Sequence, residues 1–202
     1  NNDLSKLNKA YGGEYTNFDE IDLKIDMNNF AKLYDYKIFN DKVFAQWHKW
    51  IADIIHELAP DIPLHTKIMG YVNDDGNSIN FSNNGTGYQE YYDFLELNGC
   101  DYWNYVDNQK LPLVKEMWYD YMCSLRDAPV INSEDHIIPD RNQNFSDEVG
   151  DYVAQDIYQG AIHGRYMSDI WVWERTYDHK SDFWGSILFR PDAIAKISKA
   201  TL

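Results

Sequence analysis

A carboxylate and an imidazole follow directly after an apolar run in the middle of the chain. Residues 129–131 read Pro-Val-Ile, and Asn132, Glu134 and His136 come next at every second position. A buried strand that delivers a carboxylate at its carboxyl end is how an α/β barrel presents a catalytic group. Such a carboxylate can act as the nucleophile in sugar chemistry, which normally also needs a second carboxylate. Glu134 is therefore the first candidate for a catalytic residue.

Three further predicted strands carry polar or aromatic side chains toward their ends. These are His65 and Lys67 in the first, Asp101, Trp103 and Tyr105 in the second, and Trp171, Trp173, Glu174 and Arg175 in or just after the last. Because side chains alternate between the two faces of a strand, Asn132 and Glu134 are predicted to share one face. The same alternation pairs Trp103 with Tyr105 and Trp171 with Trp173.

Helical and strand patterns alternate along the chain. We predict helices over residues 4–10, 43–58, 88–97, 113–126, 147–163 and 191–199. We predict strands over residues 62–69, 100–106, 129–135 and 169–174. This alternation is typical of a parallel α/β sheet. Four such units make half of a TIM barrel, for which about 250 residues is typical. The predicted fold class is a parallel (β/α) half-barrel.

The chain is interpreted as a single domain with two parts. Residues 1–42 form an irregular and partly helical segment, because their Asn- and Asp-rich stretch has weak periodicity. Residues 43–202 hold the four strand–helix units. No internal repeat and no low-complexity tract interrupts them.

Composition excludes some classes of partner. The net charge is −15, from 33 acidic and 18 basic residues, and such a field repels nucleic acid and anionic lipid. No apolar run approaches the roughly 18 residues of a membrane span. Aromatic residues make up 16% of the chain, which suits stacking on sugar rings, although large core side chains explain many of them equally well. Cys100 and Cys123 are expected to be reduced, and the sequence does not decide between a cytoplasmic and a secreted location.

Several segments, taken in order, resemble the retaining glycoside hydrolases of clan A, especially the β-galactosidase-like members of family 42. Residues 7–12 and 18–21 are similar to the insertion after the fourth barrel strand. Residues 62–66, 99–105, 129–134 and 170–175 are similar to strands five, six, seven and eight, and residues 160–164 to the last helix. The resemblance implies that the chain corresponds to strands five to eight of a TIM barrel and acts on a carbohydrate.

The resemblance also implies roles for individual residues. Glu134 would be the nucleophile that forms a glycosyl-enzyme intermediate. Tyr105 would hydrogen-bond this carboxylate, and Trp173 would be a platform for the sugar. The remaining candidates for substrate binding are Asn132, His136, Trp103, Trp171 and His65, with Lys67 as a further hydroxyl contact. No cofactor and no metal are expected.

One catalytic group of the family pattern has no counterpart here. The acid/base glutamate of clan A lies at the end of the fourth strand, and the chain begins where the following insertion should begin. Glu174, Asp135 and Asp101 are poor substitutes, since the first two have the wrong strand parity and the third lies too early in its strand. We expect a half-barrel that lacks the acid/base and associates with another chain or with the missing N-terminal half, because its sheet edges are open.

Two other interpretations stay open. The chain could be a non-catalytic carbohydrate-binding or interaction half-barrel that keeps an aromatic cleft. It could also be an unrelated α/β enzyme in which Glu134 and His136 act as a base or as metal ligands, for which a third ligand is not apparent.

Overall fold

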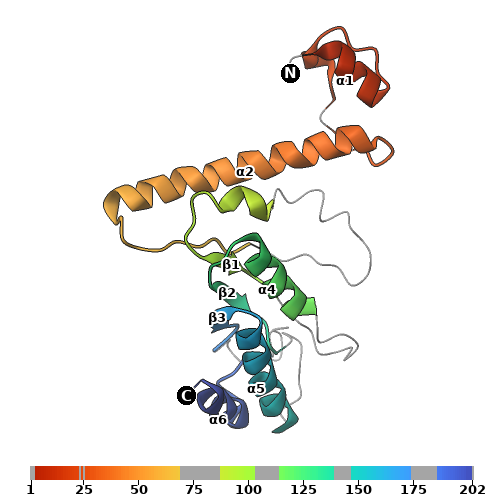
Figure 1. Cartoon of the computed structure of the whole chain (residues 1–202). Coiled ribbons are helices and arrows are strands. Elements are labelled where there is room, and N and C mark those ends of the chain that lie inside the picture. Colours follow the sequence, from red (N-terminus) through yellow and green to blue (C-terminus); the bar gives the residue numbers. More distant parts are fainter. Residues whose placement is uncertain are drawn as a thin grey trace. The chain divides into compact units, whose positions relative to one another are not determined.

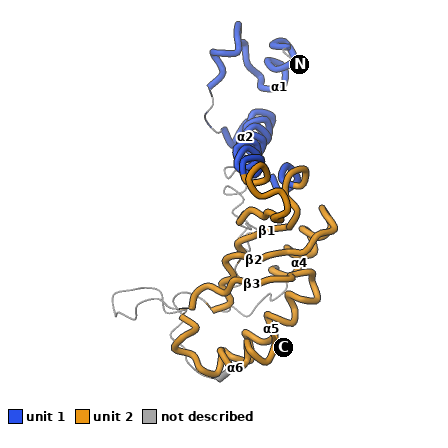
Figure 2. The backbone as a smooth tube through the Cα atoms, turned by 90° about the vertical axis from the view of Figure 1, so that its left-hand side faces the viewer, with its two compact units in different colours: residues 1–54, 73–91 blue, residues 55–72, 92–202 orange. Residues whose placement is uncertain are grey.

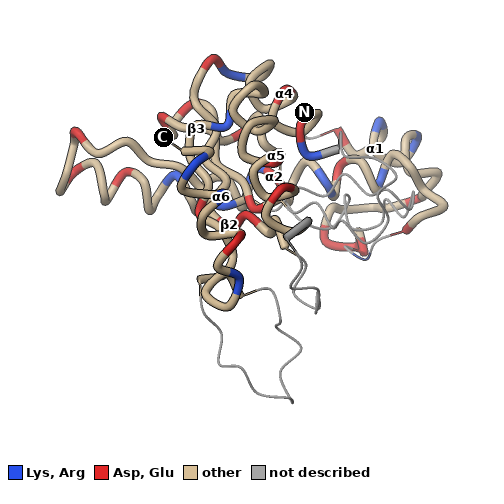
Figure 3. Tube along the Cα trace, turned by 90° about the horizontal axis from the view of Figure 1, so that it is seen from below, with Lys and Arg blue, Asp and Glu red and all other residues tan. Residues whose placement is uncertain are grey.

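The computed structural model describes residues 3–22, 24, 26–68, 87–102, 114–138, 147–173 and 186–201. The chain divides into two compact units, which Figure 2 shows in different colours. The first comprises Asn1–Ile54 and Asn73–Tyr91, and the second Ile55–Val72 and Tyr92–Leu202. Among the described residues, no helix combines the length and the apolar character needed to cross a membrane. Figure 3 shows that acidic residues are spread along the trace rather than gathered in one segment.

The first unit is helical. Helix α1 spans Leu4–Tyr11, with the Asp3 side chain accepting a hydrogen bond from the Lys6 backbone N–H at its start. Gly12 ends this helix with φ of 65°, a conformation that glycine adopts without strain. The predicted helix over residues 4–10 is thus confirmed. The 3-10 helices η1 and η2 span Phe18–Glu20 and Tyr88–Tyr91.

Helix α2 is longer than the sequence pattern predicts. It spans Phe30–Leu58 (Figure 1), whereas the prediction started at residue 43. Its only buried residues are Asp41, Ala45 and Ala52, so the early turns carry no buried apolar stripe that periodicity could reveal. Ion pairs one turn apart support the helix instead, with 2.5 Å between Lys37 Nζ and Asp41 Oδ2. The division of the chain into residues 1–42 and 43–202 stays a prediction, and its boundary falls inside this helix.

The second unit contains a three-stranded parallel sheet. Strands β1 (Asn98–Cys100), β2 (Val130–Asp135) and β3 (Arg165–Ile170) lie in that order. Helices α4 (Val114–Leu125) and α5 (Asp147–Ile162) follow β1 and β2, and α6 (Pro191–Ala200) follows β3 (Figure 1). This open α/β arrangement agrees with a half-barrel. Its correspondence to barrel strands five to eight stays a prediction.

An extended segment accompanies β1 where a strand was predicted over residues 62–69. Residues 62–68 are not assigned as a strand, and Met69 lies outside the described residues. The backbone carbonyl of Leu64 nevertheless accepts from the N–H groups of Glu96 and Leu97, and that of Ile68 from Asp101. Gly99 permits this approach, because a Cβ there would overlap the carbonyl oxygen of Thr66.

Two predictions around β1 need correction. The helix predicted over residues 88–97 is only the short η2 followed by turns. The strand predicted over residues 100–106 begins two residues earlier, as β1, and its part from residue 103 onward lies outside the described residues. Asn98 is buried and its amide donates to the carbonyls of Arg126 and Ala128, so a polar residue opens this strand where the end of a helix was predicted.

Strand β3 also differs from its prediction, whereas α4, β2, α5 and α6 match theirs within two residues. The prediction placed a strand over residues 169–174, and the observed strand is four residues earlier. It begins with a buried arginine, Arg165, which binds carboxylates inside the unit. Because this buried residue is charged, the apolar pattern does not mark the true start of the strand. Trp171 and Trp173 therefore follow β3 rather than lying within it.

Candidate functional site

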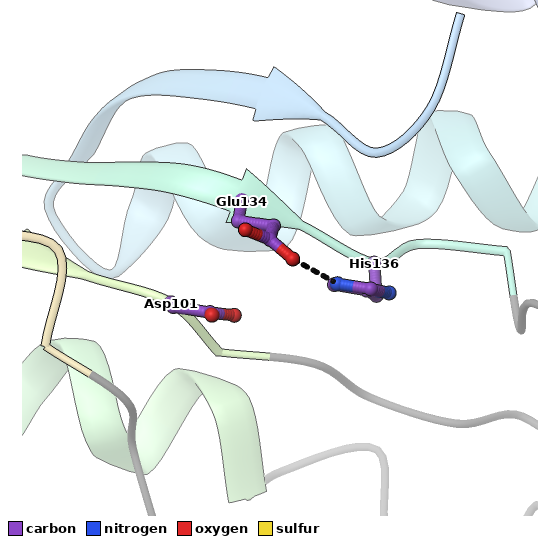
Figure 4. A group of neighbouring side chains, drawn as sticks. All are labelled: Asp101, Glu134 and His136. Carbon is purple, nitrogen blue, oxygen red and sulfur yellow. Dashed lines mark hydrogen bonds and ion pairs between the residues drawn. The ribbon is translucent and has the colours of Figure 1, made fainter. Parts of the chain in front are cut away.

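Glu134 lies near the carboxyl end of β2 and interacts with two basic side chains. Its Oε2 accepts from Lys67 Nζ. Its Oε1 lies 3.1 Å from His136 Nε2, as Figure 4 shows. The Glu134 side chain is 20% exposed, so it is held by the protein and still open to solvent. The ammonium of Lys67 thus places a positive charge next to this carboxylate.

Asp101 brings a second carboxylate to the same place. It directly follows β1, the parallel neighbour of β2, so the ends of the two strands lie side by side. Its Oδ2 is 3.5 Å from Lys67 Nζ, and its side chain is only 6% exposed. Burial raises the pKa of this carboxyl group, and the charges of Lys67 and His136 oppose that rise. Its Oδ1 is buried and has no hydrogen-bond partner among the described residues.

Trp171 lies beside His136. Its ring stacks on that of His136, with 5.4 Å between centroids and 26° between planes. Its backbone N–H donates to the carbonyl of Asp135 at 3.0 Å, which fixes the start of the segment after β3 against the end of β2. Trp173, two residues later, is 59% exposed.

An irregularity in β2 separates Asn132 from Glu134. The register between β2 and β3 shifts between Asn132 and Asp135. Asn132 donates to the Tyr119 hydroxyl on α4 at 2.9 Å, and Asp135 binds Lys115 on the same helix. Asn132 and Asp135 thus reach one helix, although regular alternation would place them on opposite faces. The prediction that Asn132 shares a face with Glu134 is wrong for this reason.

Asn132 is fully engaged inside the protein. It is buried, its Oδ1 accepts from the Tyr102 backbone N–H at 3.3 Å, and its Nδ2 donates to the Tyr102 carbonyl at 2.9 Å. These bonds attach β2 to the residue after Asp101. The amide positions the two strand ends relative to each other, and its predicted contact with substrate stays untested.

A buried ionic cluster lies behind Glu134. Asp135 and Asp156 are each bound by both Lys115 and Arg165, and the Arg165 contacts measure 2.6 and 2.8 Å. Two positive and two negative side chains from α4, β2, α5 and β3 therefore compensate one another. Burial opposes the charge on Asp156, but Lys115 and Arg165 outweigh it and lower the pKa of this carboxyl group. The sequence analysis considers Asp135 only as a poor acid and does not identify Lys115, Asp156 or Arg165. The one signal of these residues in the sequence is a charged side chain within a segment that is otherwise buried.

The remaining predicted site residues fall in different places. His65 lies against Gly99 of β1, where burial lowers the pKa of its imidazole, and its Nδ1 has no partner within the described part of the chain. Trp103 and Tyr105, together with Glu174 and Arg175, lie outside the described residues. Lys67 is more central than predicted, because it contacts both Glu134 and Asp101.

Three of these groups have the geometry of metal ligands. One ligand atom each of Asp101, Glu134 and His136 lies within 4.8 Å of the others (Figure 4). Two carboxylates and an imidazole are a ligand set that divalent transition metals accept. Asp101 supplies the third ligand that sequence reasoning did not find. The ammonium of Lys67 already contacts both carboxylates.

Comparisons with known proteins identify the family of this chain. The fold matches a crystal structure described as apo exo-carrageenase of glycoside hydrolase family 42 from Bacteroides ovatus, with a TM-score of 0.77 and 20% sequence identity. The match covers 98% of this chain and 29% of that chain. Comparison with the curated proteins gives no significant match. The model of glycoside hydrolase family 42, described as beta-galactosidase, matches residues 1–138, more than half of the sequence. The chain therefore belongs to glycoside hydrolase family 42, the family that its motifs resemble.

Proposed function

We propose that this chain carries the nucleophile half of the active site of a retaining glycoside hydrolase, with Glu134 as the nucleophile. The observation that supports this role is the position of a partly exposed carboxylate near the carboxyl end of a parallel strand, held by Lys67 and His136. Enzymes built on α/β barrels place their catalytic groups at this end of the strands. Membership of a glycoside hydrolase family supplies the reaction class.

In the proposed reaction, a Glu134 oxygen attacks the anomeric carbon of the sugar. The bond to the leaving-group oxygen breaks as the ester bond to Glu134 forms, and that oxygen takes a proton from an acid. Water then attacks the same carbon, gives its proton to the conjugate base, and releases Glu134 as a carboxylate. This chemistry needs a carboxylate at this position, where the Lys67 ammonium and the His136 ring lie against Glu134.

Asp101 is unsuited to be the acid. The two carboxyl groups of a retaining enzyme lie roughly 5–5.5 Å apart with the scissile bond between them. Asp101 and Glu134 share one ammonium, and Asp101 is almost fully buried, so no glycosidic bond fits between them. We propose that the acid/base carboxylate lies outside the described residues, in keeping with a match to only 29% of the carrageenase chain.

A galactoside is the first substrate to test, since the matching family model is described as beta-galactosidase. We propose that Trp171 and Trp173 line the sugar position. Trp171 stacks on His136 beside the nucleophile, and Trp173 exposes its ring two residues later. Flat indole faces contact the apolar faces of sugar rings, and the exposed ring keeps its area available for that contact.

The role of Glu134 can be tested by trapping the intermediate. The full-length protein is incubated with a 2-deoxy-2-fluoro-β-galactoside that carries a dinitrophenyl leaving group, and labelled peptides are mapped by mass spectrometry. We expect one label, on Glu134, and none in Glu134→Gln. Asp151→Asn is the matched control and should be labelled like the wild type, because Asp151 is 72% exposed on α5.

Two outcomes would count against this proposal. Labelling of another carboxylate would remove Glu134 from the nucleophile role. Sugar binding that survives in Glu134→Ala, without any labelling of the wild type, would favour the non-catalytic carbohydrate-binding alternative, which the exposed ring of Trp173 also allows.

A further inference from the structure

Lys67 reaches both carboxylates of the site from the segment beside β1. Its Nζ contacts Glu134 Oε2 and lies 3.5 Å from Asp101 Oδ2. The segment is fixed to the strand end by the hydrogen bond from the Asp101 N–H to the Ile68 carbonyl, 2.9 Å long. The backbone that carries Lys67 is therefore fixed next to the carboxylates, so this contact does not depend on the two side chains alone.

The carboxylates need a positive charge at this point. Asp101 is nearly buried, with one oxygen that has no hydrogen-bond partner among the described residues. Glu134 lies close enough that one oxygen of each, with His136, falls within 4.8 Å. Two negative charges at this separation repel each other strongly when water is partly excluded. A cation that touches both removes this repulsion, and either a metal ion or an ammonium can supply it.

We propose that Lys67 is a positioning residue whose ammonium takes the place of a metal ion between Asp101 and Glu134. This ammonium holds Glu134 in its working position and keeps divalent cations out of the site. Asp101 is the fixed point of this arrangement. Because the Asp101 side chain is buried at the end of β1, it fixes the ammonium of Lys67. The ammonium in turn holds Glu134, which is more exposed. The part of this inference that concerns Glu134 rests on the proposed function, whereas the exclusion of metal does not.

A simple surface ion pair would predict something different. Lys67 is 45% exposed, and exposed pairs contribute little to stability or to geometry. In that case, its removal would leave the position of Glu134 unchanged and would not open a metal site. The two explanations therefore differ in what happens when the ammonium is removed and the side-chain volume is kept.

The first measurement uses the fluorinated galactoside on the full-length protein. Lys67→Met keeps the volume of the side chain and removes its charge, and Lys67→Arg keeps the charge. We expect the maximal labelling rate of Lys67→Met to fall roughly 10- to 100-fold, the size of effect that a misplaced catalytic group causes. The half-saturating concentration of the reagent should stay near the wild-type value, and Lys67→Arg should recover most of the rate.

The second measurement needs no turnover. Zinc alone is titrated into the wild type, Lys67→Met and the double variant Lys67→Met/Asp101→Asn by calorimetry. We expect Lys67→Met to bind one Zn²⁺ at least about tenfold more tightly than the wild type, since two carboxylates and an imidazole become available. The double variant should lose this gain, which assigns the metal to the cluster. Lys67→Gln serves in the same way if Lys67→Met does not fold.

The results separate the two proposals. Absence of labelling in the wild type contradicts the proposed function, and the zinc titration then still tests Lys67. Equal zinc affinities of the wild type and Lys67→Met would overturn the exclusion of metal. An unchanged labelling rate in Lys67→Met, with Glu134 labelled in the wild type, would overturn the positioning role.

Discussion

Replacing Lys115 with methionine should destabilise the second unit far more than an ordinary loss of charge. Lys115 is buried between Asp135 and Asp156, at 2.8 Å from the latter. Without it, Arg165 alone faces two buried carboxylates, so one negative charge has no partner. Breaking a buried ion pair on one side costs about 3–5 kcal/mol of unfolding free energy. For a domain of this size, each kcal/mol corresponds to about 2–4 °C, so the melting temperature should fall by roughly 6–20 °C.

The assay is urea unfolding of the full-length protein, followed by tryptophan fluorescence, for Lys115→Met and a matched control. Lys196→Met removes the same kind of side chain from an exposed pair with Asp151 on α5. Exposed pairs contribute about 0–1 kcal/mol, so the control should stay within that range. The double variant Lys115→Met/Asp156→Leu leaves Arg165 facing only Asp135 and should regain much of the lost stability.

The stability lost in Lys115→Met depends on pH. In the wild type, the pKa of Asp156 is lowered: burial opposes the shift, and Lys115 and Arg165 outweigh it. Its stabilising contribution is therefore present above the unfolded value of about 3.9 and is lost as pH falls through the folded pKa. In Lys115→Met, a carboxylate without its full partners has a raised pKa, so its penalty is present at neutral pH and disappears as protonation proceeds. The difference between the two proteins should be largest near pH 7 and shrink toward about pH 4. A Lys115→Met protein as stable as Lys196→Met, or a difference independent of pH, would refute the reasoning.

Two further predictions concern β1. Gly99→Ala should destabilise the protein by about 1–3 kcal/mol in urea unfolding, because the added methyl group overlaps the Thr66 carbonyl oxygen and must push the segment away from the strand; unchanged stability would mean that the segment is not packed there. Cys100 should resist a thiol reagent at pH 8 until the protein is unfolded, since it is fully buried and burial raises the pKa of its thiol, with Asp135 adding to the rise. Counting reacted thiols by absorbance checks this, and rapid modification of Cys100 in the native protein would contradict the burial of β1.

Sequence patterns predict the elements that bury an apolar face. Helices α4, α5 and α6 and strand β2 lie within two residues of their predictions, because each buries apolar side chains at a regular period. Val153 of α5 packs in a core with Ile137 and Ile187, and α4 and β2 bury Met122 and Val130. The apolar pattern also predicts the candidate nucleophile, Glu134, since an apolar strand that ends in a carboxylate can be recognised in the sequence. Lys67 and His136 are predicted as residues that contact substrate, but the sequence does not predict their contacts with Glu134.

What the pattern could not predict is the burial of charge. Arg165 begins β3 and Lys115 lies in the first turns of α4, and both are inside the protein because carboxylates from other elements meet them. Single-residue hydrophobicity assigns such residues to the surface, so β3 was placed four residues too late. The start of α2 is not predicted for a related reason, because its early turns hold the ion pair Lys37–Asp41 and no buried apolar stripe.

The irregularity in β2 explains how Glu134 can be both partly exposed and fixed. In its proposed role as nucleophile, Glu134 cannot be packed in the core, so its position depends on the residues around it. In β2, the buried anchors lie on either side of the pair Ser133–Glu134. Asn132 bonds to the Tyr102 backbone and the Tyr119 hydroxyl, and Asp135 bonds to the ionic cluster. Regular alternation would turn one of these two anchors away from α4. The extra residue between them lets both anchors reach the side of the sheet that faces α4. The backbone of Glu134 is therefore held on both sides. Its carboxylate extends toward Lys67 and His136.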